Sequence, residues 1–61
     1  MHPNLLLQEA QQLHSVSDRL DTLADQHPNY SHLIVPISGS VRTTATLLEV
    51  LVATKLGGSP A

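Results

Sequence analysis

The apolar residues between positions 4 and 26 recur on the period of an α-helix. They lie three or four residues apart and form one stripe: Leu6, Ala10, Leu13, Val16, Ser17, Leu20, Leu23 and Ala24. Asn4 is a suitable N-cap, and Pro28 disfavours helical geometry in the residue before it. The pattern therefore predicts a helix over residues 4–26.

Small residues repeat every seven positions along this stripe, at Ala10, Ser17 and Ala24. Such a row allows a second helix to approach closely. The same residues are equally consistent with simple filling of one side of the helix. Both interpretations place this side of the helix in the protein interior.

A second helical pattern follows a short connection at residues 27–30, after which Asn29 or Ser31 can act as N-cap. Its stripe consists of Tyr30, Ile34, Ile37, Val41, Ala45, Leu48, Val52 and Leu56. Gly57 and Gly58 then favour a stop. Because a short loop joins antiparallel neighbours, the sequence predicts an all-α, two-helix antiparallel hairpin with helices at about 4–26 and 30–56. Residues 1–56 form the predicted single domain, and 57–61 a disordered C-terminal tail.

Pro36 lies inside the second pattern and predicts a kink or a break in that helix, because proline has no backbone N–H to donate. The segment is also rich in β-branched residues, so strands at 33–37 and 46–54 are the alternative. We favour the helix because residues 47–53 show no strand-like alternation and a lone two-stranded hairpin is marginally stable.

The chain has 61 residues and no cysteine, which excludes disulfides and thiolate zinc sites as sources of stability. In residues 47–53, six of the seven side chains are apolar, so one neighbouring helix cannot cover them all. We therefore expect a homodimeric four-helix bundle, the commonest symmetric solution. A helix of another protein would satisfy the same requirement. The predicted interface consists of Ile37, Val41, Leu47, Leu48, Val50, Leu51, Val52 and Leu56.

Histidine supplies the other candidate site. His27 and His32 bracket the predicted loop, with Asp25 just before it, and this set could bind a metal such as zinc. Solvated loop histidines are the simpler interpretation. We predict no metal site and no cofactor, and keep a histidine-based metal-binding protein as an alternative.

Charge removes several classes of function. Three basic residues against five acidic ones give a net charge of −2, which argues against a nucleic-acid partner. The most apolar stretch, 46–56, is too short to span a bilayer, and no secretory signal is recognisable, so we expect a cytoplasmic protein without a membrane association. Acidic residues crowd the end of the first helix, and in an antiparallel hairpin Arg42 could reach Asp18 within the hairpin or across the dimer.

The segment Ser17-Asp-Arg-Leu-Asp21 resembles the serine-to-aspartate motif of small helical-hairpin phosphatases that act on sporulation response regulators. The resemblance covers five residues, and it lies on the first predicted helix, whereas that family carries its motif on the second. With no phosphate-binding loop or nucleophile elbow, we predict that the chain is not an enzyme. The predicted function is a self-associating dimerisation or protein–protein interaction module. The alternative is a heteromeric adaptor or chaperone-like subunit that binds a partner helix.

Overall fold

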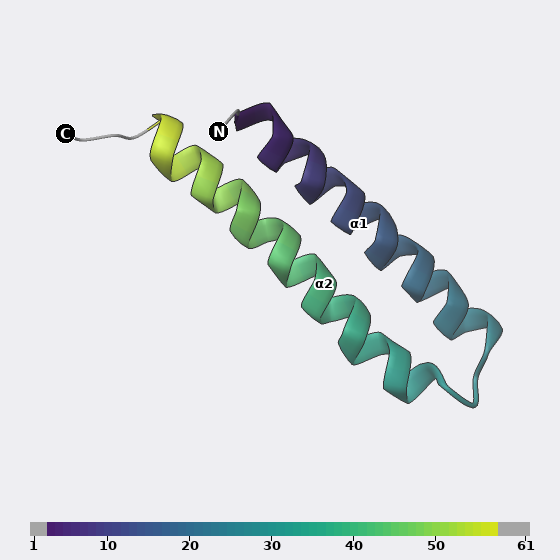
Figure 1. Ribbon diagram of the computed structural model, residues 1–61. Coiled ribbons are helices and arrows are strands. Elements are labelled where there is room, and N and C mark those ends of the chain that lie inside the picture. Colours follow the sequence, from purple (N-terminus) through teal and green to yellow (C-terminus); the bar gives the residue numbers. More distant parts are fainter. Residues whose placement is uncertain (1–2, 58–61) are drawn as a thin grey trace.

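Two antiparallel helices make up the fold of the computed structural model, which describes residues 3–57 and the side chains of residues 5–55. Helix α1 spans Pro3–Gln26 and helix α2 spans Ser31–Val52, and a π-helical turn, η1, continues α2 over Ala53–Gly57 (Figure 1). The predicted all-α hairpin is confirmed. The alternative strands at 33–37 and 46–54 are wrong, because both segments are helical.

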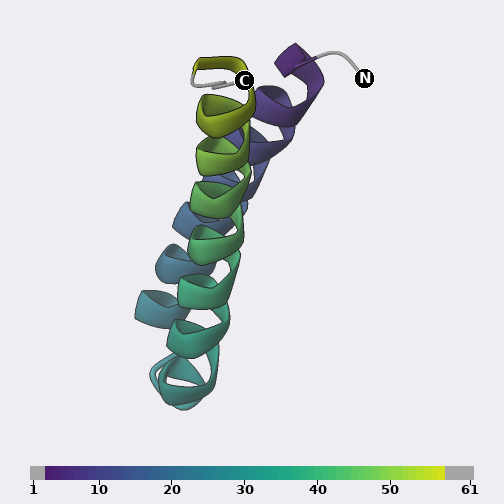
Figure 2. The ribbon, with the colours of Figure 1, turned by 90° about the vertical axis from the view of Figure 1, so that its left-hand side faces the viewer.

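The hairpin is a thin rod of 50 × 17 × 13 Å with a radius of gyration of 14.5 Å. A compact domain of this length would have a radius of about 10.5 Å. Figure 2 shows that α1 crosses behind α2 and that no third layer covers either helix. The described part of the chain therefore has one internal contact line instead of a closed core.

Helix α1 begins one residue earlier than expected. Pro3 is its first residue, a position that suits proline because its fixed φ is helical and the first helical N–H has no intrahelical acceptor. Asn4, which we expected to be the N-cap, therefore lies inside the first turn. At the other end the His27 N–H still donates to the Leu23 carbonyl at 2.9 Å, and Pro28 then ends the helix.

The loop caps α2 through its backbone. The Tyr30 N–H donates to the His27 carbonyl at 2.9 Å, and the Ser31 N–H donates to the Pro28 carbonyl at 3.4 Å. Tyr30 occupies the N-cap position with φ −113° and ψ 0°, without a side-chain cap hydrogen bond. The predicted caps Asn29 and Ser31 are thus wrong, because Ser31 is already helical and the turn itself provides an acceptor for its N–H.

Pro36 does not break α2, which runs without interruption from Ser31 to Val52. The side chains of His32 and Pro36 are both exposed, so the carbonyl that lacks its usual donor, that of His32, lies on a side open to water. The α-helix ends at Val52, and η1 extends the helical path to Gly57, one residue past the predicted end. Of the predicted tail, residues 58–61 lie outside the described residues.

Candidate interaction surface

A line of small residues joins the two helices. From α1 come Ala10, Ser17 and Ala24, and from α2 Ser38, Ala45 and Val52; each of these is at most 7 % exposed. Ser31, one heptad before Ser38, continues the line and is half-buried. We call these residues the small-residue seam. Apart from Ser31, the residues of the seam are the only buried ones among the described side chains, so the close-approach interpretation of Ala10, Ser17 and Ala24 is the correct one.

Two serines at the centre of the seam hydrogen-bond across it. The Oγ atoms of Ser17 and Ser38 are 2.9 Å apart, and each also lies within 3.2 Å of the other residue's backbone carbonyl oxygen. These bonds require close backbones, which side chains no larger than serine permit. No described buried side-chain N or O atom lacks a partner, so the two buried serines carry no desolvation penalty from unmade hydrogen bonds.

Asp21 extends this cluster to the surface. The Ser38 hydroxyl donates to Asp21 Oδ1 at 2.5 Å, and Arg42 Nη2 donates to Oδ2 at 2.7 Å. The Ser38 hydrogen bond, and then the Arg42 guanidinium, hold the pKa of the Asp21 carboxyl below its usual value. Arg42 therefore pairs with Asp21 within the hairpin. Our expectation of Asp18 as its partner there is wrong, because Asp21 is the carboxylate one turn beyond the seam residue Ser17.

A second polar pair lies one heptad further towards the open end. His14 Nε2 and Glu49 Oε1 are 3.4 Å apart, with both side chains partly exposed. His14, Asp21, Arg42 and Glu49 all follow a seam residue by four positions. We call this set the polar flank. Each member of the polar flank is paired with another member within the same chain.

The opposite side of the seam is aliphatic. Each member precedes a seam residue by four positions and is half-buried: Leu6, Leu13, Leu20, Ile34, Val41 and Leu48. Antiparallel neighbours are related by an approximate two-fold axis perpendicular to the hairpin plane, so equivalent flanks of α1 and α2 lie on the same side. These residues form a continuous apolar flank that runs the length of the hairpin.

The predicted interface residues do not share one environment. Ile37, Leu47, Val50 and Leu51 are 42–62 % exposed. Val41 and Leu48 belong to the apolar flank. Val52 lies in the seam and is covered by the hairpin itself, and the Leu56 side chain lies outside the described residues. The predicted stripe did not include Leu33, which is 56 % exposed.

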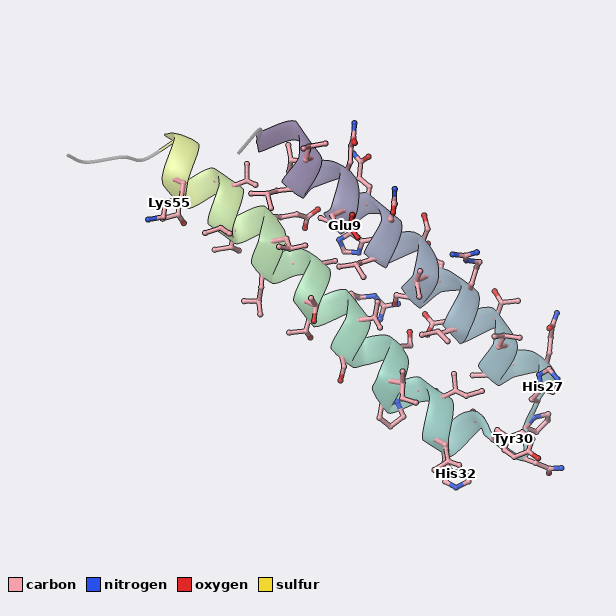
Figure 3. The ribbon with its side chains drawn as sticks, in the orientation of Figure 1. Glu9, His27, Tyr30, His32 and Lys55 are labelled. Atoms are coloured by element: carbon pink, nitrogen blue, oxygen red, sulfur yellow. The ribbon has the colours of Figure 1, made fainter. Side chains whose placement is uncertain are left out.

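The histidine candidates do not converge. In the part of the chain that the structure describes, no three His, Asp or Glu side chains are grouped as metal ligands. His27 and His32 lie at the loop end, with the His32 side chain pointing away from α1 and Tyr30 between them (Figure 3). His27 Nδ1 is instead 3.1 Å from the Leu23 carbonyl oxygen of its own helix.

The Ser17 and Ser38 hydroxyls are completely covered, which leaves neither placed to attack a substrate. Within residues 3–57, neither helix combines the length and apolarity needed to cross a membrane. The fold thus defines a helical hairpin with a seam of small residues, two of them hydrogen-bonded serines, and an apolar flank that no third helix covers. No protein-family model, curated protein or solved structure matches the chain.

Proposed function

We propose that this chain is a self-associating helical hairpin that acts as a dimerisation or protein–protein interaction module, in which two copies cover each other's open aliphatic side chains in a four-helix bundle. One observation carries the proposal: every large aliphatic side chain described, apart from Val52, is half-buried or exposed. Fully burying one Leu, Val or Ile contributes about 1.5–3 kcal/mol. In a single hairpin most of these side chains remain in contact with water, so most of this free energy of burial is not gained.

The distribution of the polar groups supports the same proposal. The charged groups of the polar flank pair with one another, Asp21 with Arg42 and His14 with Glu49, so they do not require a second protein to supply ion-pair partners. The apolar flank has neither polar side chains to solvate it nor a third helix to cover it. A second hairpin would supply two further helices with the same heptad spacing, as four-helix bundles require.

Sedimentation equilibrium combined with circular dichroism tests the proposal. At micromolar concentration we expect twice the mass of one chain, high helical content, and a melting temperature that rises with protein concentration, because folding and association are coupled. A folded, helical monomer would contradict the proposal. A chain that is monomeric and unfolded by itself would also contradict it, and would favour the heteromeric adaptor.

A further inference from the structure

A second heptad stripe runs along α2 on a side that α1 does not cover. Its members are spaced four and three residues apart and are all exposed: Leu33, Ile37, Ser40, Thr44, Leu47 and Leu51. We call this set the outer stripe. Alternating steps of four and three are the spacing with which one helix packs along another in a coiled coil. The half-buried row Ile34, Val41 and Leu48 lies between the outer stripe and the seam.

The composition of the outer stripe is symmetric about its midpoint, level with Arg42. Large aliphatic residues stand at both ends, and the hydroxyls of Ser40 and Thr44 stand in the middle. The four aliphatic side chains are 42–62 % exposed. A stripe with this symmetry is complementary to a reversed copy of itself.

We propose that the partner on this stripe is a second copy of the chain, with the two α2 helices packed antiparallel about a two-fold axis level with Arg42. Leu33 of one copy then lies opposite Leu51 of the other, Ile37 opposite Leu47, and Ser40 opposite Thr44. This inference rests on the proposed self-association and specifies its direction and register.

The offset between the two α2 helices follows from pairing side chains of the same kind across the interface. At the register above, every aliphatic residue meets an aliphatic residue and each hydroxyl meets a hydroxyl. A slip of one heptad in either direction places Leu33 against Thr44, or Leu51 against Ser40, and leaves the other end of each stripe without a partner. Either slip buries hydroxyls against aliphatic side chains, which is unfavourable unless they find new hydrogen bonds.

Charge favours the antiparallel direction. Lys55 lies at the open end and points away from α1 (Figure 3), one turn beyond Leu51 on the side of the outer stripe. A parallel pair would bring the two Lys55 side chains and the two equivalent helix ends together. An antiparallel pair places the two Lys55 side chains at opposite ends of the dimer and sets the two α2 helix dipoles in opposite directions.

Cysteine cross-linking tests the direction, because the chain has no cysteine of its own. The probes are Leu33→Cys and Leu51→Cys, one of them carrying a short tag, oxidised alone and as an equimolar mixture. In the antiparallel pair the two copies of position 33 are separated by 18 residues, about 27 Å along the helix, whereas a disulfide needs Cα atoms within about 7 Å. We expect the mixed disulfide in high yield and little of either homodisulfide.

The other outcomes are separable. Homodisulfides from each single variant, with little mixed product, would overturn the antiparallel arrangement and favour a parallel dimer. A dimeric mass without any disulfide would overturn the outer stripe as the contact while leaving self-association intact. A monomeric mass would contradict the proposed function itself. Val50→Cys, similarly exposed but off the stripe, is the matched control and should not cross-link to position 33 or 51.

Discussion

The small-residue seam and the outer stripe occupy the same helix with the same heptad spacing, yet their side chains differ in size and in exposure. On the seam, Ser38 and Ala45 are 1 % and 0 % exposed, whereas on the outer stripe Leu47 is 62 % exposed. The difference shows that burial within this hairpin selects small residues, because the closely approaching backbones leave no room for leucine. Large aliphatic residues are therefore displaced to surfaces that only another helix can cover.

The largest expected effect comes from charging the outer stripe. Leu51 is 42 % exposed in the hairpin, and Leu51→Asp should put two carboxylates in place of apolar contacts in each dimer. Burying an unpaired carboxylate costs several kcal/mol, so the dissociation constant should rise roughly a hundred-fold or more. The dimer should dissociate and its helices should melt together, as followed by sedimentation and circular dichroism.

Val50→Asp is the control for that experiment. Val50 is 52 % exposed, but it lies on a row with Thr43 and Thr46 instead of on the stripe. The Val50→Asp variant should keep the dimeric mass and nearly the melting temperature of the unmodified chain. Equal effects of the two substitutions would show that the outer stripe is not a distinct surface.

A smaller effect is expected from enlarging the seam. Ala45→Leu places a bulky side chain where the helices touch, and overpacking of this kind costs about 1–3 kcal/mol. Urea denaturation should show a lower midpoint for Ala45→Leu than for Ala53→Leu, which adds the same atoms at an exposed position. A stabilised Ala45→Leu would mean that the helices are further apart than the seam implies.

The smallest expected effect is on the hydroxyl cluster. Ser38→Ala removes the hydroxyl that donates to Asp21 Oδ1 and lies 3.0 Å from the Ser17 carbonyl oxygen, for a net loss of about 1 kcal/mol. It also removes the largest cause of the lowered pKa of Asp21, so that pKa should rise towards its ordinary value while Arg42 keeps part of the shift.

The contribution of the Asp21 carboxylate to the free energy of unfolding depends on pH. Because the pKa of Asp21 is lower in the folded state, its stabilisation is present above the unfolded pKa and is lost as the pH falls through the folded pKa. Carbon-detected NMR titration of the Asp21 carboxyl, with acid denaturation alongside, measures both effects. An unchanged Asp21 pKa in Ser38→Ala would contradict the role of this hydroxyl.

The sequence predicted the elements well and their contacts less well. The leucine heptad of residues 4–26 and the proline after it gave the first helix almost to the residue. The stripe predicted for residues 30–56 counted only apolar side chains, so it included Ile37, which faces outward, and missed Ser38, which faces α1. The heptad Ser31, Ser38, Ala45 and Val52 was visible as a repeat of small residues, but a hydrophobicity pattern does not register serine.

The sequence by itself determined two amphipathic helices, a short turn between them, and more aliphatic surface than two helices can bury together. Those features depend on local periodicity, on proline geometry and on composition. Tertiary structure alone decided which side of α2 meets α1, that Arg42 pairs with Asp21, and that the loop backbone caps α2. Each of these depends on the rotation and offset of one helix against the other, which the interlocking Ser17 and Ser38 hydroxyls fix only once the two backbones are in contact.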